Sequence, residues 1–328
     1  MQVMILAAGL GTRLGAIGAE MPKAALPVCG YPAIAFGLAL CRAAGLDDVI
    51  VNLHHRGDVV RAAVGDGARF GVRVRWSEEP DLLGTGGGIA RARPLFRSEP
   101  VLVMNAKVVA DIDLPAVLAA HAAAPAGRVA TMVLHDERGP EERPPVAVDE
   151  AGRVVALRGV RAAGEGAAPA AERAFTGVHV LEGRLLDRLP AGVSDVIAAA
   201  YLPALLRGEY VASFTARGYF AEHSTPARYL AGNLALLRQP ALVSHPPGPL
   251  SGVAPAARID PGARIVPPVH VGTAIVETGA VIGPDAVIGD GARVAPGMRV
   301  ARSVVWPGVE VSEDLDGAIA TPGGVMRV

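Results

Sequence analysis

The sequence is poor in cysteine, which removes two common ways of holding a small protein together. Its 328 residues include two cysteines, Cys29 and Cys41, whose spacing matches no metal-binding pattern. Such a chain predicts neither a disulfide framework nor a structural zinc site, and it suits a reducing compartment. We therefore expect a cytoplasmic protein.

The sequence also lacks an excess of charge of either sign and a long apolar run. With 31 basic and 32 acidic residues, the formal net charge is −1, so neither nucleic acid nor an acidic membrane surface is favoured as a partner. No apolar run reaches the roughly 20 residues that span a bilayer. Met1 leads directly into an apolar stretch typical of a core strand rather than of a signal peptide. The length allows two domains.

The most informative segment begins with that apolar stretch. Residues 2–6 predict a strand, which runs into Leu6-Ala-Ala-Gly-Leu-Gly-Thr-Arg13 and, after a gap, Pro22-Lys23. Small residues at the carboxyl end of a strand leave backbone N–H groups open to an anion. Arg13 adds a planar fork for phosphate oxygens and Lys23 adds a compact charge. The combination predicts a polyphosphate site, with an ordinary tight turn as the alternative.

Two familiar phosphate motifs do not fit this turn. Leu14 stands where a dinucleotide fingerprint needs its third glycine, and no Gly-Lys-Ser/Thr ending marks a P-loop. The segment resembles instead the signature of the sugar-1-phosphate nucleotidyltransferase family, Leu-Ala-Ala-Gly-x-Gly-Thr-Arg followed by Pro-Lys. The similarity covers about residues 1–237.

Three later segments carry the same resemblance. Glu78-Glu-Pro-Asp-Leu-Leu-Gly-Thr-Gly-Gly-Gly is similar to the family's Leu-Gly-Thr-Ala/Gly-Gly, whose glycines let backbone approach base and ribose. A plain loop is the alternative interpretation of these glycines. Phe175-Thr-Gly-Val-His-Val matches a Thr-Gly-Ile/Val strand that faces the sugar, and Ser224-Thr-Pro-Ala-Arg-Tyr resembles the closing Gly-Thr-Pro-x-x-Tyr, which predicts a helix from Pro226.

Hydrophobic periodicity agrees with the fold that the resemblance implies. A helix over 33–44 and buried strands starting near Val49 and over 72–76 alternate along the chain. We expect an α/β, Rossmann-like nucleotidyltransferase domain with a mostly parallel sheet and its site at the carboxyl ends of the strands.

The resemblance assigns roles to residues at matching positions. Arg13, Lys23 and the Gly-rich turn are expected to bind the phosphates of the nucleotide. Asn105 and Gly177 are expected to border the sugar phosphate. The residues expected around the nucleotide are Leu6, Ala7, Ala8, Gly9, Gly11, Thr12, Glu79, Gly84 and Thr85. A carboxylate such as Glu79 can accept both donors of the guanine edge, which favours GTP. Glu78 and a backbone group are the alternatives for this role. Mannose-1-phosphate guanylyltransferases are the nearest fit within the family.

Two departures from the family pattern concern Mg²⁺. The strand after the Gly-rich segment ends in Asn-Gly-Asp in the family, and its carboxylate holds the metal; here Asn105-Ala-Lys107 follows Val101-Leu-Val-Met, so Lys107 replaces that ligand. Glu222 replaces the second carboxylate and remains a candidate ligand. Lys107 is then a candidate catalytic cation. Asp111 and Asp113 are expected to cap a helix or to serve a structural role.

The last eighty residues predict a second architecture. Aliphatic residues recur about every six positions, at Ile259, Ile265, Val271, Ile282, Ile288, Val294 and Val300. This period fits neither helix nor amphipathic strand, and it resembles the hexapeptide repeats of a left-handed parallel β-helix. We expect a nucleotidyltransferase domain over 1–240, a linker over 241–250 and about three β-helix coils over 251–328. Coils of this family carry either acyltransferase sites or assembly surfaces. The one histidine in an open position, His270, is interpreted as a surface residue, so assembly into a homo-oligomer is favoured.

Three functions remain open at this stage. The resemblance implies transfer from a nucleoside triphosphate to a sugar-1-phosphate, with nucleotide-sugar and pyrophosphate as products. A regulatory relative that binds nucleotide-sugar without turnover is the alternative, because of Lys107. A hexapeptide acyltransferase with an accessory N-terminal domain is the remote alternative.

Overall fold

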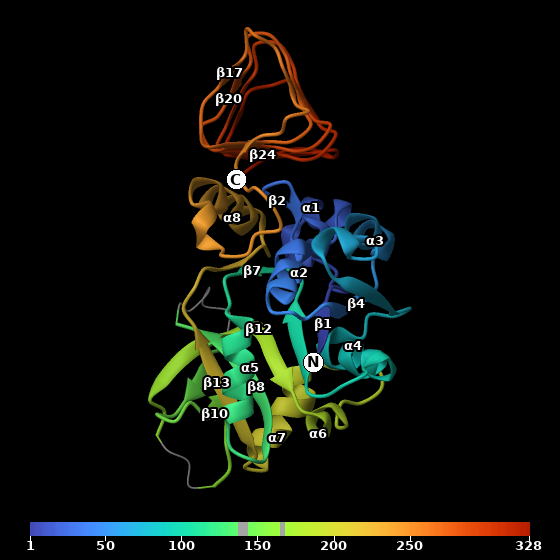
Figure 1. Cartoon of the computed structure of the whole chain (residues 1–328), viewed down its shortest axis with the longest axis vertical. Helices are drawn as coiled ribbons and strands as arrows, with labels where there is room; N and C mark the ends of the chain where they lie inside the picture. Colours follow the sequence, from blue (N-terminus) through green and yellow to red (C-terminus); the bar gives the residue numbers. More distant parts are fainter. Residues whose placement is uncertain (137–143, 165–167) are drawn as a thin grey trace. The chain divides into compact units, whose positions relative to one another are not determined.

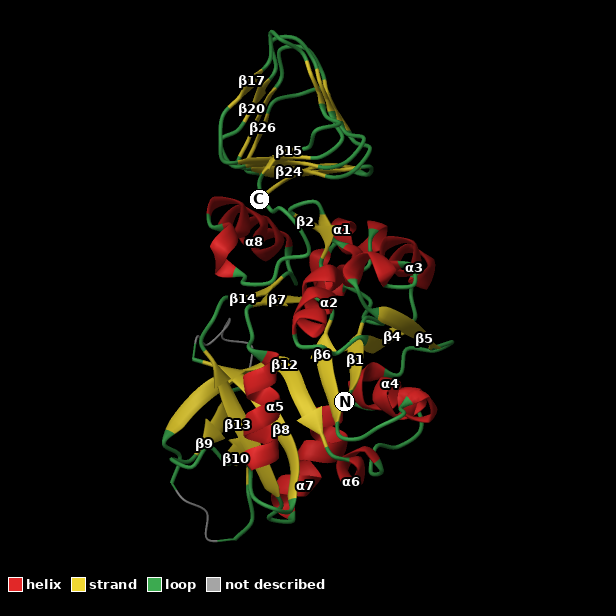
Figure 2. Cartoon of the chain, viewed as in Figure 1, coloured by secondary structure: helices red, strands yellow, loops and turns green. Residues whose placement is uncertain are grey.

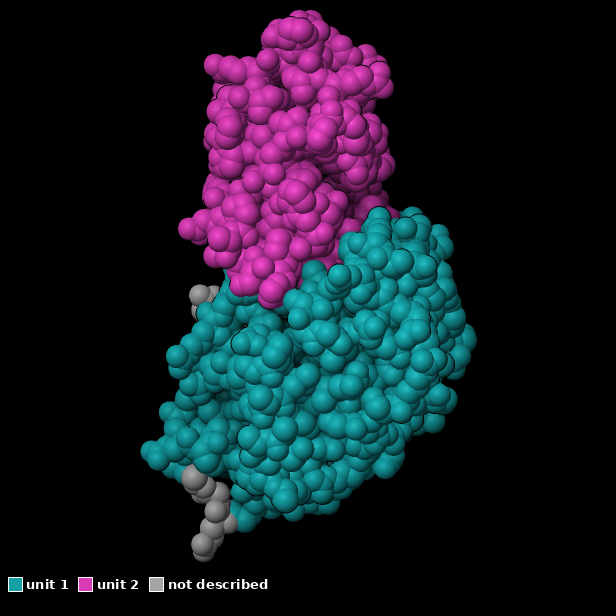
Figure 3. Space-filling model, viewed as in Figure 1, with its two compact units in different colours: residues 1–9, 37–220 teal, residues 10–36, 221–328 magenta. Residues whose placement is uncertain are grey.

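The structure is a computed structural model that describes residues 1–136, 144–164 and 168–328. Its described part divides into two compact units, residues 1–9 with 37–220 and residues 10–36 with 221–328 (Figure 3). The domain boundaries at residues 240 and 250 rest on the change from the nucleotidyltransferase-like sequence to the six-residue repeat, and they stay a prediction. The compact units group residues by contact, and they place the Gly-rich turn from Leu10 onward with the C-terminal repeats.

The first unit is an α/β domain built on one sheet, which has ten strands within the described residues (Figures 1 and 2). Its central path has the order β11-β10-β9-β12-β6-β1-β4-β5, and β8 joins β12 to β13. The strands around β1 are parallel: β1 Gln2–Leu6, β4 Asp48–Leu53, β5 Arg73–Glu78 and β6 Val101–Asn105. The other strands are β8 Arg128–His135, β9 Val146–Val148, β10 Val154–Leu157, β11 Val160–Arg161, β12 Ala171–Leu181 and β13 Tyr210–Ala216.

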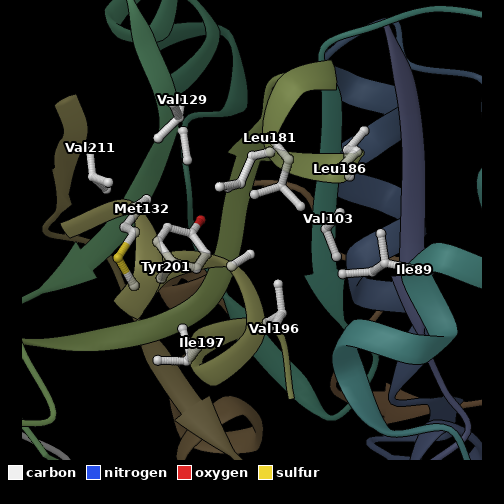
Figure 4. Packing of buried hydrophobic residues seen from close by; sticks show 14 of the residues in the cluster. Ile89, Val103, Val129, Met132, Leu181, Leu186, Val196, Ile197, Tyr201 and Val211 are labelled. Carbon is white, nitrogen blue, oxygen red and sulfur yellow. The ribbon is translucent and has the colours of Figure 1, made fainter. Parts of the chain in front are cut away.

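Helices cover this sheet and bury its apolar side chains. They are α2 Ile34–Ala43, α3 Gly57–Val64, α4 Gly84–Ala92, α5 Leu114–Ala123, α6 Gly183–Leu186, a π-helix Ile197–Tyr201 and α7 Leu202–Leu206. Helix α4 contacts β1 and β4, while α5 contacts β8 and β13. Figure 4 shows the core that results, in which Tyr201 and Met132 lie among aliphatic side chains. This packing confirms the α/β class with a parallel sheet around β1.

The elements expected from the sequence are present with small shifts of their ends. The helix predicted over 33–44 is α2, and the strands predicted near Val49 and over 72–76 are β4 and β5. Asp113 caps α5 by accepting a hydrogen bond from the N–H of Ala116 at 2.9 Å, which confirms the capping prediction for that residue. Among the described residues, no helix is both long and apolar enough to cross a membrane.

The second unit holds a triangular parallel β-helix (Figures 1 and 2). Residues 251–328 are all described, and their short strands form three sheets: β15-β18-β21-β24-β27-β28, β16-β19-β22-β25 and β17-β20-β23-β26. The register moves from Val269 to Ala286 and then to Ser303, which is three hexads less one residue for each coil. The repeat therefore builds coils, as the six-residue period predicts.

The coils are more numerous than predicted. The strands of each coil are β15 Gly252–Val253, β16 Arg258–Ile259 and β17 Arg264–Ile265; β18 Val269–Val271, β19 Ile275–Val276 and β20 Val281–Ile282; β21 Ala286–Ile288, β22 Arg293–Val294 and β23 Arg299–Ala301; β24 Ser303–Val305, β25 Glu310–Val311 and β26 Leu315–Asp316. The fully described segment 251–328 thus has four coils where about three were expected. The fourth escaped the pattern because its repeat shortens, with Val304 pairing Ile319.

The β-helix ends in an antiparallel hairpin of β27 Ala318–Thr321 and β28 Gly324–Arg327. Along its inside, the predicted aliphatic positions from Val271 to Val300 are buried. Helix α8, Pro226–Arg238, packs on β21, β24 and β27, and it starts where the sequence predicts, with the Thr225 side chain as its cap.

His270 corrects a prediction. Its ring lies against Gly30 and edge-on to Tyr31, with 6.4 Å between the ring centroids, rather than on an open surface. Burial lowers the pKa of His270. The histidine is therefore a packing residue between the second coil and the hairpin turn of β2 Pro27–Val28 and β3 Tyr31–Pro32.

Candidate functional site

The ends of three parallel strands define the candidate site in the first unit. Leu6 at the end of β1 is in register with Asn52 of β4 and Asn105 of β6. The Asn52 Oδ1 accepts a hydrogen bond from the N–H of Ala7 at 2.7 Å, and the carbonyl of Leu6 accepts one from Ala106 at 3.0 Å. The segment after β1 therefore starts at the carboxyl edge of the sheet, where open α/β sheets bind ligands.

A relay of side chains continues from Asn52 to the Gly-rich segment. The Asn52 amide donates to Glu79 Oε1 at 2.6 Å, and Glu79 Oε2 accepts from the N–H of Leu83 at 3.2 Å. Glu79 is 4% exposed. Its carboxylate is held inside the protein by these two donors, which does not favour the predicted contact with a guanine edge.

The glycines of this segment bring the protein's own chain together. Gly84 has a φ of 71°, and a Cβ there would lie 2.6 Å from the carbonyl oxygen of Ser194. A Cβ on Gly88 would lie 2.6 Å from Glu79 Oε1. The N–H of Gly86 donates to Ser194 at 2.8 Å. These contacts within the protein explain why glycine is needed at these positions, a reason that the sequence alone did not show. A helix starts here despite its glycines.

Thr85 also has partners within the first unit. Its hydroxyl donates to Asp195 Oδ2 at 3.3 Å and accepts from the N–H of Val196 at 2.9 Å. Asp195 pairs with Arg158 at 2.8 Å. The hydroxyl thus ties the start of α4 to the segment before the π-helix.

Asn105 and Gly177, the two residues predicted near the sugar phosphate, lie in contact. Gly177 has a φ of 81° at a shift of register in β12, between Phe175 and Val178. A Cβ at this position would overlap the Asn105 amide nitrogen. The structure thus brings together two residues 72 positions apart, and it requires glycine at one of them.

The Gly-rich turn belongs to the second unit from Leu10 onward. It contains the 3₁₀ turn η1 Thr12–Leu14, helix α1 Ala16–Glu20 and the 3₁₀ turn η2 Lys23–Ala25. A Cβ on Gly11 would lie 3.8 Å from Lys23 Cε, so the lysine stem passes this glycine. Arg13 is exposed and Lys23 is half-buried. Gly11 and Lys23 are therefore neighbours, as a phosphate cradle requires.

The residues predicted for the metal are placed as follows. Lys107 is in the turn between β6 and β7 Val108–Ala110, and Glu222 ends β14 Phe220–Glu222. Among the described residues, no group of three or more His, Cys, Asp or Glu side chains is placed so that it could hold a metal ion. A lysine ammonium cannot ligate a cation, so the donor set at the end of β6 does not fit a resident Mg²⁺.

Sequence reasoning missed Asn52, Ser194 and Asp195. Asn52 carried a signal, because it is a buried polar amide next to the last residue of a strand whose other buried residues are apolar. Ser194 acts through its backbone carbonyl, which no side-chain pattern announces.

Comparisons with known proteins agree with this architecture. Residues 2–158 match the model of the nucleotidyl transferase family. Over 248 residues the chain is 31% identical to mannose-1-phosphate guanylyltransferase of Mycobacterium tuberculosis, which covers 74% of this chain and 67% of that protein. It is 41% identical over 117 residues to N-acetylmuramate α-1-phosphate uridylyltransferase of Neisseria meningitidis, covering 35% of this chain and 51% of that protein. The alignments thus span between about half and two thirds of these relatives.

Solved structures share the fold. The crystal structure of HddC from Yersinia pseudotuberculosis, complexed with GMP-PN, superposes with a TM-score of 0.59 at 19% identity, covering 72% of this chain and 99% of that one. A putative glucose-1-phosphate thymidylyltransferase from Bacillus anthracis also gives a TM-score of 0.59, at 20% identity, covering 73% and 96%. Together with the strand-end site, the family match and the guanylyltransferase relative show that this chain belongs to the nucleotidyl transferase family.

Proposed function

We propose that this protein transfers a nucleotidyl group from a nucleoside triphosphate to a sugar-1-phosphate. An oxygen of the sugar phosphate attacks the α-phosphorus, the bond from that phosphorus to the bridging oxygen of the β-phosphate breaks, and pyrophosphate leaves with the bond's electron pair. The observation that supports this most directly is the contact between Asn105 and Gly177 at the end of the parallel strands, in a chain whose relatives act on sugar phosphates.

The proposed roles follow the chemistry of each side chain. Arg13 and Lys23 neutralise the triphosphate, and backbone N–H groups of the turn, including that of Gly11, donate hydrogen bonds to its oxygens. Asn105 and Gly177 border the sugar phosphate. Glu79 positions the Gly-rich segment through its bonds to Asn52 and Leu83 rather than reading the base.

Lysine usage supports roles for Lys23 and Lys107. Of the 31 basic residues in the chain, two are lysines, and both are residues to which the proposal assigns a role. All other basic residues are arginines. We therefore infer that Lys23 and Lys107 are retained because their sites need a compact ammonium that the planar guanidinium of arginine does not replace. We assign Lys107 a charge at the β6 end that stabilises the transferring phosphate, and we route no step through a resident metal. Magnesium enters as part of the triphosphate substrate, and Glu222 stays a predicted ligand only.

The finer substrate assignment is GTP with mannose-1-phosphate. With Glu79 buried, this preference rests on the relatives that carry that name, from Mycobacterium tuberculosis and from Schizosaccharomyces pombe, the latter 27% identical over 240 residues. Such substrates are intracellular, which agrees with a cytoplasmic location.

A binding protein without turnover is the second candidate, favoured by Lys107 at the position of a metal-binding carboxylate in the family. A panel of GTP, UTP, dTTP and ATP against mannose-, glucose- and N-acetylglucosamine-1-phosphate, followed by pyrophosphate release, tests both. We expect release with GTP and mannose-1-phosphate. Micromolar nucleotide binding by calorimetry without release from any pair would support the second candidate and contradict the first.

A further inference from the structure

The Gly-rich turn is anchored by the β-helix in this structure. Residues 10–36, which carry Arg13 and Lys23, belong to the same compact unit as residues 221–328 (Figure 3). One anchor joins residues 301 positions apart, near the two ends of the chain.

The anchor is a carboxylate clasp between α1 and the C-terminal hairpin. Glu20 Oε1 accepts a hydrogen bond from the Thr321 hydroxyl at 2.8 Å, and Oε2 accepts one from the N–H of Gly323 at 3.1 Å. Hydrogen bonds to a carboxylate are about twice as strong as those between neutral groups. Glu20 ends α1, where the helix dipole offers a negative charge no stabilisation, so the clasp supplies its favourable partners.

The hairpin turn is shaped for this carboxylate. A Cβ on Gly323 would overlap Glu20 Oε1, so only glycine lets the carboxylate sit against the turn. The φ of Gly323 is not in the left-handed region, unlike that of Gly324 at 129°. Alanine at position 323 would therefore displace the Glu20 carboxylate without straining the backbone.

Helix α1 connects the clasp to the phosphate-binding residues. A Cβ on Gly18 would lie 2.5 Å from the carbonyl oxygen of Gly11, so the helix packs directly on the glycine turn. Lys23 follows Glu20 by three residues, which span at most about 10 Å. Fixing Glu20 therefore limits where both Gly11 and the Lys23 backbone can lie.

A second anchor restrains the following residues of the turn. The Tyr229 hydroxyl of α8 donates to the carbonyl of Pro27 at 2.5 Å, and it accepts from the Trp306 indole N–H at 3.0 Å. Asn233 Oδ1 accepts from the N–H of Cys29 at 2.8 Å. This anchor is buried, whereas the clasp lies where substitution changes little of the core.

We propose that the C-terminal hairpin Ala318–Arg327 positions the phosphate-binding turn through Glu20, which makes the β-helix part of the nucleotidyl-transfer machinery. The inference rests on the proposed function for its catalytic consequence, while its structural consequence can be measured without turnover. Glu20 and Gly323 are positioning residues, since they act on substrate through Gly11 and Lys23.

The test compares Glu20→Ala and Gly323→Ala with two matched controls. Glu310→Ala removes an exposed carboxylate from the same β-helix, and Pro322→Ala changes the exposed neighbour in the same hairpin turn. Glu20→Gln keeps an acceptor oxygen and serves as the conservative variant. Hydrogen–deuterium exchange of residues 10–25 is measured in the full-length proteins, together with kcat and KM for pyrophosphate release.

We expect exchange in residues 10–25 to rise in Glu20→Ala and Gly323→Ala and to stay at the wild-type level in both controls. In the same two variants kcat should fall by at least about tenfold, because displaced catalytic groups lose rate steeply, and Glu20→Gln should recover part of it. Unchanged exchange and unchanged kcat in Glu20→Ala would overturn the inference. If exchange rises in Glu20→Ala and Gly323→Ala but the wild-type protein itself releases no pyrophosphate, the clasp is retained and the proposed function is rejected instead.

Discussion

At the scale of single residues, the most informative buried group outside the site is His179. Its Nδ1 is 2.8 Å from the Tyr201 hydroxyl, and the two rings stack with centroids 5.7 Å apart. Burial lowers the pKa of His179 to about 3. An unfolded histidine titrates near 6.5, so between these values the unfolded chain binds the proton and the folded one does not.

This difference sets the sign of a pH effect. The contribution of His179 to stability is complete above about pH 6.5 and is lost as the pH falls toward 3, by up to about 1.4 kcal/mol for each pH unit. We expect urea unfolding at pH 7.5, 6 and 5 to show a shallower pH slope in His179→Asn than in the wild type. Equal slopes would show that His179 does not titrate on unfolding.

Arg13 and Lys23 yield a second prediction at this scale. If they neutralise a triphosphate, replacing either with alanine should weaken nucleotide binding by about 1.5–3 kcal/mol, the range for hydrogen bonds to charged groups. Calorimetry with GTP and UTP measures this. Arg258→Ala, an exposed arginine of the first coil, is the control, and equal affinities in all variants would remove the phosphate assignment.

A third prediction at the residue scale concerns Lys107. A fixed ammonium repels a second cation, so wild-type pyrophosphate release should saturate at about one Mg²⁺ per triphosphate. Lys107→Asp should require additional Mg²⁺, and Lys107→Arg should not. A wild type that already depends on magnesium well beyond the triphosphate would contradict a catalytic role for the ammonium.

At the scale of elements, the contact of β12 with the end of β6 depends on one glycine. Gly177 and Gly159 have φ values of 81° and 79°, but only Gly177 has a neighbour at its Cβ position, Asn105. We expect Gly159→Ala to cost about 1 kcal/mol from backbone strain alone. Gly177→Ala should cost at least about 2 kcal/mol and raise KM for the sugar phosphate, because Asn105 must also move. Urea unfolding and initial rates check both, and equal costs would show that the Asn105 contact is unimportant.

The elements were predictable where local pattern decides them. The apolar runs of β1 and β4 and the Thr225-Pro226 cap of α8 are each complete within a few residues of sequence. Helix α4 was not predictable in this way, because four glycines in its first turns oppose helix formation. Its contacts with Ser194, more than a hundred residues later, override that preference. The role of Glu79 was not predictable for the same reason, because its hydrogen bond with Asn52, 27 positions away, forms only in the folded protein.

At the scale of the whole molecule, the sequence separates a transferase domain from a repeat domain, whereas the contacts do not follow that division. Residues 10–36 share a compact unit with the β-helix through pairs such as Cys29 with Asn233, 204 positions apart. No periodicity encodes such a pair. The hexads predicted coils and their inward side chains, because each is decided by its immediate neighbours, but they carried no signal of what α8 and the turn would contact.

The two ends of the β-helix differ, and this difference leads to a prediction about assembly. The last coil is closed by β28, which pairs with β27. The first coil supplies the terminal strand of each of the three sheets. Its aliphatic side chains are less buried than those of the next coil: Val253 of β15 is 42% exposed and Ile259 and Ile265 are only partly buried, whereas Val271 is 1% exposed. Strand edges that no other described strand pairs with, beside exposed aliphatic groups, favour pairing with another chain.

We therefore expect the full-length protein to form a homo-oligomer through the first coil, and Val253→Asp to lower its mass, because a carboxylate at that edge would have to be desolvated on assembly. Val193→Asp, at a valine 78% exposed in the first unit, is the matched control and should leave the mass unchanged. Light scattering at tens of micromolar measures both. A monomeric wild type, or an equal loss of mass in the two variants, would show that the first coil does not mediate assembly. The β-helix would then act within its own chain.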